Sequence, residues 1–296
     1  MTRCILVPLD GSSISERAIP VAAGLARHHH AHLHLVRVFP PLTARALNAP
    51  PLDPTFDEEQ RAKAARALQR MARRIHRATQ LEVTPQVRVG HTIDEIEAAA
   101  REVSADLVVM TTHGRGGVSR AWLGSVTETL LRHLHVPVLV TRQRLDLSTM
   151  LARGVPFAKV LLPVDGTPES EEVIDDVSRL LHGVPLDLTL AHVVSPSPVM
   201  LANLEDASAV HAVEHEYLMP LAAKWRDERR AVHTVVLTAN SAARALADLA
   251  HAGAFDLIAM RTHARHGMAR FALGSVADKL LRLTTRPVYV RGPERS

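Results

Sequence analysis

Two short segments of the chain combine glycines with a charged side chain, as nucleotide and phosphate sites do. In Pro8–Ser12, Asp10 follows directly after an apolar run. In Thr112–Gly117, Arg115 stands among glycines, and Leu123–Thr127 then begins a helical pattern. Glycines let a backbone approach a ligand, a helix N-terminus favours anions, and arginine carries a fixed positive charge. The second segment therefore indicates a phosphate cradle, whereas Asp10 either accepts hydrogen bonds from a ligand or only caps the next helix.

Alternating strands and helices must position these segments. Continuous apolar runs are typical of strands buried on both faces of a parallel sheet, and a 3.6-residue periodicity predicts the helices between them. In the first half of the chain we expect strands over 4–9, 32–38, 82–89, 106–111 and 136–141. The helices expected between them cover 13–28, 57–79, 93–103 and 121–133. This order implies parallel β-α-β units, which bind ligands beyond the carboxyl ends of their strands.

The second half of the chain repeats the first. Val160–Thr167 corresponds to Ile5–Ser12, and Asp256–His263 corresponds to Asp106–His113, at offsets of 155 and 150 residues. A repeat of this length is a duplicated domain, and we expect domains over 1–145 and 156–296. The strands expected in the second copy cover 159–164, 186–194, 233–238, 256–260 and 287–291. A helix expected over 206–230 contains Pro220, which should kink or split it.

Composition excludes several classes of protein. Arginine and lysine number 35 against 31 aspartates and glutamates, so the basic pI reflects little net charge. Aromatic residues make up only 3% of the chain, too few for platforms that stack bases, and we expect no nucleic acid partner. No apolar run reaches the about 18 residues of a membrane span, and the first strand begins too early for a signal peptide. The single cysteine, Cys4, suits the reducing cytoplasm, where we expect the protein.

The motifs in combination resemble the universal stress protein family in its tandem two-domain form. The resemblance is carried by Pro-x-Asp-Gly-Ser at 8–12, Thr-His-Gly-Arg-Gly-Gly at 112–117 and Leu-Gly-Ser-Val at 123–126. It covers nearly the whole chain and implies an α/β fold of two tandem Rossmann-like, adenine nucleotide alpha hydrolase-like domains. Each would hold a five-stranded parallel sheet of order 3-2-1-4-5 with helices on both faces. The strand order would then reverse between strands one and four, where the two segments meet.

Many members of that family bind ATP, with or without Mg²⁺, through Gly-x2-Gly-x9-Gly-(Ser/Thr). Gly114, Gly124 and Ser125 match this motif, and Thr111 occupies the first glycine position. In the first domain, the resemblance implies adenine contacts from Asp10 and Val38 and ribose contacts from Met110 and Thr111. The phosphates would lie against the later residues. The complete expected site is Pro8, Asp10, Gly11, Val38, Met110, Thr111, His113, Gly114, Arg115, Gly117, Gly124, Ser125, Val126 and Thr127.

The second domain departs further from the motif. Its corresponding site residues are Asp165, Val193, Arg265, Gly274 and Ser275. Arg261 and Ala264 replace the first two glycines. A Cβ at Ala264 costs on the order of 1 kcal/mol if the backbone there needs a positive φ. Arg261 is large enough to fill a nucleotide site or to meet a phosphate. We therefore expect the first domain to bind nucleotide better than the second.

The resemblance implies a stress-response protein that senses or signals through a bound adenine nucleotide. The sequence shows no paired general base beyond Asp10 and so favours a protein that is not an enzyme. Slow hydrolysis of ATP, or phosphate transfer to Ser125, is one alternative. A ligand-free dimerising scaffold is the other, which the departures from the motif at Thr111, Arg261 and Ala264 would suit. Strand five is a sheet edge, edges pair, and in members of the family this strand commonly mediates domain pairing. The resemblance therefore implies that the two domains pair through strand five, and a homodimer is a further expectation.

Three other clusters have simpler explanations than a site. His-x-x-Glu-His at 211–215 and the histidines between His28 and His34 contain metal-ligand residue types. A solvated helix face and a helix end that runs into a strand explain them, so we predict no metal site. The arginine-rich helix between Arg61 and Arg77 could bind an acidic partner or a lipid surface, and a solvated face is its simpler interpretation.

Overall fold

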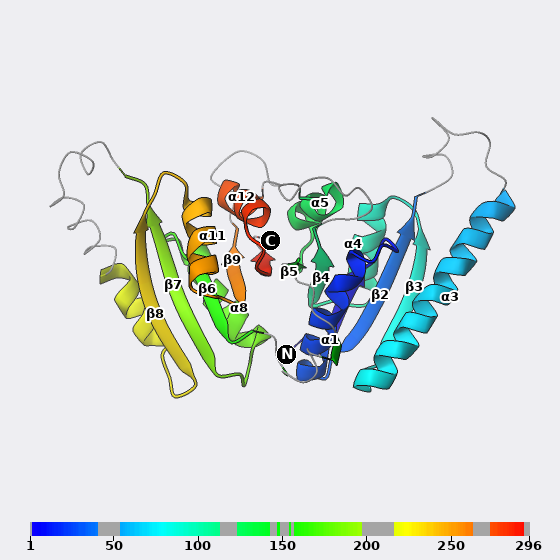
Figure 1. The fold of residues 1–296 in the computed structure, drawn as a ribbon, viewed down its shortest axis with the longest axis horizontal. Helices are drawn as coiled ribbons and strands as arrows, with labels where there is room; N and C mark the ends of the chain where they lie inside the picture. Colours follow the sequence, from blue (N-terminus) through cyan, green and yellow to red (C-terminus); the bar gives the residue numbers. More distant parts are fainter. Residues whose placement is uncertain are drawn as a thin grey trace. The chain divides into compact units, whose positions relative to one another are not determined.

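A computed structural model of the chain describes residues 2–40, 54–112, 123–142, 147–148, 154, 157–196, 216–262 and 273–292. The chain divides into two units, Met1–Pro156 (unit 1) and Phe157–Ser296 (unit 2). Each unit contains five parallel strands with helices packed on both faces of the sheet (Figure 1). The α/β fold expected from the repeat is therefore confirmed.

In unit 1 the strands follow the order β3-β2-β1-β4-β5. Every neighbouring pair is parallel. The central strand β1 is buried on both faces, and Ile5, Leu6 and Val7 have no exposed surface. The uninterrupted apolar run of this strand is explained by helices on both sides. The strands are β1 (Cys4–Pro8), β2 (His32–Phe39), β3 (Val83–Val89), β4 (Leu107–Thr111) and β5 (Val138–Thr141).

The helices of unit 1 divide between the two faces of its sheet. Helices α1 (Ala18–His29) and α3 (Pro54–Thr79) contact each other on one face. Helices α4 (Thr92–Glu102) and α5 (Ser125–His133) contact each other on the opposite face. Helices α1 and α3 connect strands that run from β1 to the β3 edge of the sheet, whereas α4 and α5 connect strands that run in the opposite direction across the sheet, to β5. Right-handed crossovers therefore place the two pairs of helices on opposite faces.

Unit 2 repeats this architecture in the order β8-β7-β6-β9-β10. Its strands are β6 (Lys159–Pro163), β7 (Leu186–Val194), β8 (Arg230–Thr238), β9 (Leu257–Arg261) and β10 (Val288–Arg291). Its helices are α7 (Pro168–Glu171), α8 (Val173–Leu180), a helical segment at 216–225, α11 (Ala242–Ala252) and α12 (Ser275–Leu283). Relative to the sequence of each unit, both sheets have the predicted order 3-2-1-4-5.

Two helices of unit 1 begin later than the periodicity predicts. The first was expected from Ser13, but a 3-10 turn, η1 (Ser15–Arg17), precedes α1. Hydrogen bonds between Ser12 and Ser15 hold the chain in a turn at this point and delay the helix. The helix expected from residue 121 begins at Ser125, because the backbone of Gly124 is extended and bonded to the preceding strand end. Residues 121 and 122 lie outside the described part of the chain.

The helix expected over 206–230 is wrong at its C-terminal end. The described part, 216–225, is helical on both sides of Pro220, so no split occurs there. The chain then turns at Asp227, whose carboxylate accepts from the Arg229 amide at 2.9 Å and pairs with the Arg230 side chain. This turn lets β8 begin at Arg230, three residues before the expected start. Residues 206–215 lie outside the described part.

Candidate functional site

The turn after β1 is built by hydrogen bonds among its own residues. The carboxylate of Asp10 accepts from the Ser12 amide at 2.8 Å. The Ser12 hydroxyl accepts from the Ser15 amide at 3.1 Å, and the Ser15 hydroxyl donates to the Ser12 carbonyl at 2.9 Å. Gly11 has a φ of +84°, a backbone conformation that residues other than glycine rarely adopt. Asp10 therefore has a capping role in this turn, and its contact with a ligand stays a prediction.

Strand register brings residues from three strands level with one another at the carboxyl edge. The pairing of β1 with β2, continued past its last pair, puts Asp10 level with Val38. The pairing of β1 with β4, continued likewise, puts Asp10 level with Thr112. Strand order reverses at β1, because β2 lies on one side and β4 on the other. Open parallel sheets bind ligands at such a reversal, so both motif segments lead to a suitable edge.

The carbonyl groups at the end of β4 are bonded to the start of α5. The Gly124 amide donates to the Thr112 carbonyl at 2.8 Å, and the buried Thr127 hydroxyl donates to the Thr111 carbonyl at 3.1 Å. A Cβ at position 124 would lie 2.6 Å from the same Thr112 oxygen, so glycine is required by space rather than by φ. Ser125 is exposed where α5 begins. The first amides of a helix have no intrahelical acceptor, so this edge offers donors to an anion.

Most of the residues expected at the first-domain site lie in the described part of the chain. Pro8 ends β1, Val38 lies near the end of β2, and Met110 and Thr111 end β4. Val126 follows Ser125 in α5. The remaining expected residues of this site, His113, Gly114, Arg115 and Gly117, lie outside the described residues.

Two arginines at this edge were missed by the sequence analysis. The Arg37 guanidinium lies against the turn after β1. A Cβ built on Gly11 would be only 2.6 Å from the central carbon of this guanidinium. Arg142 follows β5 and donates from Nε to the Thr112 hydroxyl at 2.8 Å. Their counterparts in the second copy are His192 and Gly292. A search for arginines present in one copy alone could have found both, although nothing in the sequence places them beside the turns.

Unit 2 builds the first turn in the same way. The carboxylate of Asp165 accepts from the Thr167 amide at 3.3 Å and from its hydroxyl at 2.7 Å. The Thr167 hydroxyl in turn accepts from the Ser170 amide at 3.2 Å, which caps α7. Gly166 has the same φ of +84° as its counterpart. Val193 lies in β7, Gly274 and Ser275 lie at the start of α12, and Arg265 is outside the described residues. The retained turn shows that the Asp-Gly-(Ser/Thr) motif has a structural role in both units.

Arg261 at the end of β9 is held by two carboxylates of the helices after β6. Its Nε donates to Asp176 at 2.6 Å, its Nη2 donates to the same carboxylate at 3.2 Å, and Nη1 pairs with Glu172. Asp176 is only 2% exposed and also accepts from Arg179 at 2.6 Å and Arg291 at 3.1 Å. Burial opposes the charge of Arg261, but Asp176 outweighs it and raises the pKa of the guanidinium. The positive charge of Arg261 is therefore balanced within the unit.

This ion cluster has no equivalent in unit 1. The repeat aligns Asp176 with Val21 and Arg261 with Thr111, and Arg291 aligns with Thr141. These unit 1 residues are buried and make no ion pair. The two units thus share the turn after the first strand but differ at the end of the fourth strand.

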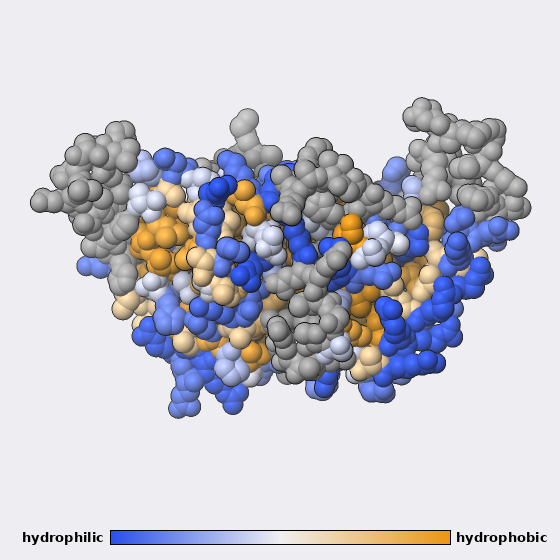
Figure 2. All heavy atoms as spheres, viewed as in Figure 1, coloured by the Kyte–Doolittle hydropathy of each residue, from blue (hydrophilic) through white to orange (hydrophobic). Residues whose placement is uncertain are grey.

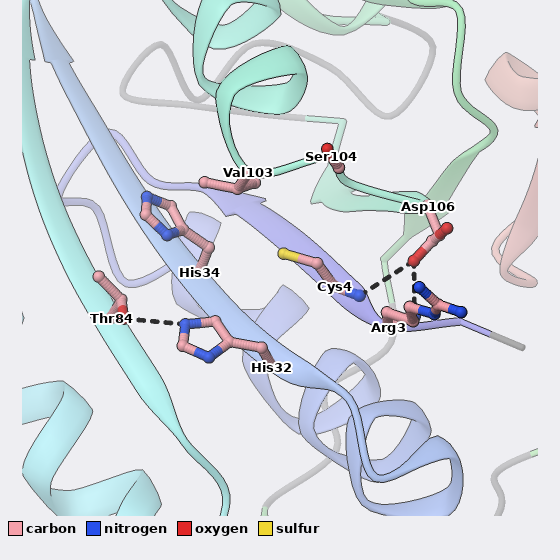
Figure 3. Close-up of a pocket in the computed structure, with 8 residues that line it drawn as sticks. All are labelled: Arg3, Cys4, His32, His34, Thr84, Val103, Ser104 and Asp106. Atoms are coloured by element: carbon pink, nitrogen blue, oxygen red, sulfur yellow. Dashed lines mark hydrogen bonds between the residues drawn. The ribbon is translucent and has the colours of Figure 1, made fainter.

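A separate hollow of about 780 Å³ lies at the amino ends of the strands of unit 1 (Figure 3). The Asp106 carboxylate on its rim accepts from the Arg3 amide at 2.6 Å and the Cys4 amide at 3.0 Å. Asp256 makes the same pair of bonds in unit 2. Burial, and then the charge of Asp106, raise the pKa of Cys4 to about 11. The carboxylate bonds join strand ends in both units. We therefore assign the polar residues that line the hollow a structural role and not a ligand-binding one.

The histidines of this hollow are bonded to the neighbouring strand. His32 Nε2 lies 2.8 Å from the Thr84 hydroxyl, and His34 Nε2 lies 3.1 Å from the Gln86 side-chain oxygen. Burial lowers the pKa of His34. Within the described ranges, no group of three or more histidine, cysteine or acidic side chains could hold a metal ion. The His-x-x-Glu-His segment at 211–215 lies outside them. No helix in the described part of the chain is both long and apolar enough to cross a bilayer.

Each half of the chain matches the same family of known proteins. The model of the universal stress protein family matches residues 1–142 and, a second time, residues 156–291. The chain belongs to the universal stress protein family. Two matches within one chain confirm the tandem form that the motifs indicate.

Relatives of similar length occur in mycobacteria. A universal stress protein of Mycobacterium tuberculosis is 29% identical over 318 aligned residues, which cover 97% of this chain and 94% of the relative. One of Mycolicibacterium smegmatis is 29% identical over 301 residues, with coverage of 98% and 97%. The crystal structure of a universal stress protein from Archaeoglobus fulgidus matches with a TM-score of 0.72 over 99% of both chains. Its sequence is only 18% identical, so this likeness concerns the fold alone.

Proposed function

We propose that unit 1 of this universal stress protein binds an adenine nucleotide, namely ATP with or without Mg²⁺. The protein would then act in the stress response as a nucleotide-dependent sensor or signalling module. One observation carries the proposal: described residues of both motif segments, Asp10 and Thr112, lie at the edge where the strand order of unit 1 reverses. There Asp10 is level with Val38 on one side and with Thr112 on the other.

The chemistry of this edge suits a nucleotide. Gly124 lets the backbone approach the Thr112 carbonyl closely, where a Cβ would lie 2.6 Å from its oxygen, so backbone lines the start of α5. The first amides of α5 would donate to phosphate oxygens, and Arg37 and Arg142 add positive charge beside the two turns. Mg²⁺ commonly binds through phosphate oxygens and water with few protein ligands, so a carboxylate cage is not required.

Unit 2 supports the expectation that the first domain binds better. The ion cluster of Arg261 and Asp176 occupies the end of its fourth strand, whereas unit 1 has the uncharged residues Thr111 and Val21 at the corresponding positions. Removing Arg261 from this cluster to meet a phosphate would leave a buried carboxylate with fewer donors. Asp176 would keep Arg179 and Arg291, so the loss of Arg261 costs about 1–2 kcal/mol, which opposes nucleotide binding in unit 2.

A binding role, rather than turnover, fits these residues. A ligand at 100 times its Kd stabilises the bound form by about 2.7 kcal/mol, enough to change what the protein offers to a partner. We also propose that the protein is cytoplasmic, as its single buried cysteine suggests. Pairing of the two units through their fifth strands, and a homodimer built on the same strands, remain proposals.

The test is to denature the purified protein and identify the released nucleotide by chromatography. We expect adenine nucleotide at about one per chain, and an Asp10→Ala protein should release much less. The matched variant Asp165→Ala, which removes the equivalent bond in unit 2, should release the same amount as the unmodified protein. The proposal is wrong if no nucleotide is released and titration with ATP and Mg²⁺ produces no heat.

A further inference from the structure

The outward face of α3 carries a continuous row of basic side chains. The six residues are all exposed and, apart from one adjacent pair, recur every three or four positions, so they share one side of the helix. The opposite side is apolar and packs onto the sheet through Ala64, Leu68, Ala72 and Ile75. Figure 2 shows the hydrophilic surface that results along α3. We call this row the basic face: Lys63, Arg66, Arg70, Arg73, Arg74 and Arg77.

Within the described part of the chain, the basic face is not neutralised by ion pairs. In the described residues, no ion pair joins any of its six members to a carboxylate. Two acidic residues of α3 have described side chains, Glu58 and Glu59, and both precede the basic face; Glu59 lies one turn before Lys63, with which it forms no ion pair. Four arginines, Arg70, Arg73, Arg74 and Arg77, line a surface hollow of about 600 Å³. The face is therefore a concentrated positive surface open to a partner.

Neither the fold nor the helix dipole requires this face. The helical segment at 216–225, which follows the second strand of unit 2 as α3 follows that of unit 1, has Lys224 as its one basic residue. The helix dipole favours cations only in the last turn, whereas Lys63 and Arg66 lie several turns earlier. Unit 1 carries 20 lysines and arginines against 14 acidic residues, and unit 2 carries 15 against 17. The excess of positive charge thus belongs to one unit.

We propose that the basic face docks an acidic α-helix of a partner protein. Guanidinium groups bind carboxylates through paired hydrogen bonds, and five of the six residues are arginines. Apart from the adjacent Arg73 and Arg74, successive members are three or four residues apart, about 4.5–6 Å along the axis. Carboxylates at the same spacing on a facing helix would each meet a guanidinium.

Other anionic partners fit the face less well. Helices that lie in a membrane surface insert an apolar side, and the apolar side of α3 is already buried against the sheet. Single-stranded nucleic acid is held by stacking on aromatic rings, and the basic face has none. Duplex DNA offers phosphates and requires neither an apolar helix side nor aromatic rings. It is therefore included as a competitor in the test.

The experiment measures binding of labelled peptides by fluorescence anisotropy. One peptide is an alanine-rich helix of about 20 residues with glutamates every three or four positions on one side. Its isomer has the same composition with glutamates spread around the helix. We expect the one-sided peptide to bind about tenfold more tightly than the isomer, and salt should weaken its binding.

Matched variants separate this face from general charge. Replacing Arg70, Arg73, Arg74 and Arg77 with glutamine should reduce binding of the one-sided peptide at least about tenfold. The control replaces four exposed arginines elsewhere, Arg3, Arg27, Arg101 and Arg229, with glutamine and should bind as the unmodified chain does. Circular dichroism checks that both variants remain folded.

Three results would overturn the proposal. The first is equal binding of the two peptides, which would mean that charge alone is recognised. The second is equal loss of binding in the variant and its control. The third is tighter binding of a short DNA duplex, or of vesicles containing phosphatidylserine, than of the one-sided peptide at the same salt concentration.

Discussion

The ion cluster of unit 2 gives a prediction that compares the two copies directly. Asp176 and Arg261 can be replaced by their unit 1 counterparts, Val21 and Thr111, as Asp176→Val and Arg261→Thr. A double-mutant cycle with the two single variants and the double variant measures how strongly the side chains are coupled. The structure predicts strong coupling, because two hydrogen bonds join them and both side chains are buried.

The magnitudes follow from the partners that each substitution leaves behind. Asp176→Val leaves Arg261 with Glu172 alone and should cost about 3 kcal/mol of unfolding free energy, the low end for a broken buried pair. Arg261→Thr leaves Asp176 bonded to Arg179 and Arg291 and should cost about 1–2 kcal/mol. The double variant removes both the Asp176 carboxylate and the Arg261 guanidinium, so neither is left without the other. It should therefore cost about 2 kcal/mol less than the sum of the two single-variant costs.

Tryptophan fluorescence can report on unit 2 by itself. The chain has two tryptophans, Trp122 in unit 1 and Trp225 in unit 2. In a Trp122→Phe background, urea unfolding followed by Trp225 fluorescence gives the free energy of unfolding of unit 2 for each variant. If the costs of the single variants add within about 0.5 kcal/mol, the reasoning about this cluster is wrong.

Three further predictions concern the turns and the buried thiol. Asp10→Ala and Asp165→Ala should each destabilise their own unit by about 1 kcal/mol in urea unfolding, because each loses a turn-capping bond; a difference above about 1 kcal/mol would contradict the shared role. Gly124→Ala should lower the unfolding free energy by about 1–3 kcal/mol, because its Cβ would lie 2.6 Å from a carbonyl oxygen. Gly274→Ala should be nearly neutral, because no described atom lies within 4 Å of the added Cβ. Equal effects of the two variants in urea unfolding would refute this reasoning. Because burial raises the pKa of Cys4 from 9.0 to about 11, the folded state holds the thiol proton more tightly than the unfolded state. Stability present below about pH 9 should therefore decline as the pH rises to about 11, and a Cys4→Ala protein with the same decline would refute the assignment.

Strand order was predictable because local patterns and simple chain rules are enough to determine it. The apolar run of Cys4–Leu9 and its repeat at 159–164 both form central strands, as parallel sheets with two covered faces require. The helix starts were less predictable. Side-chain bonds at Ser12 and Ser15 compete with the helical ladder for the same backbone groups, and periodicity does not register this competition.

The candidate site was predictable where it depends on strand ends and not where it depends on distant partners. The level positions of Asp10, Val38 and Thr112 follow from strand order and register. The partner of Arg261 does not, because Asp176 is 85 residues away and is brought near only by the packing of α8. Ion pairs between elements depend on which rows of a helix face a strand, and sequence spacing alone does not specify those rows.

The stoichiometry of ATP binding tests the central claim most directly. Isothermal titration of ATP with Mg²⁺ should give one site per chain for the unmodified protein and for Asp165→Ala. The site should be lost in Asp10→Ala, although both variants lose the same kind of turn bond. Two equal sites per chain, or loss of the site in Asp165→Ala instead, would contradict the account.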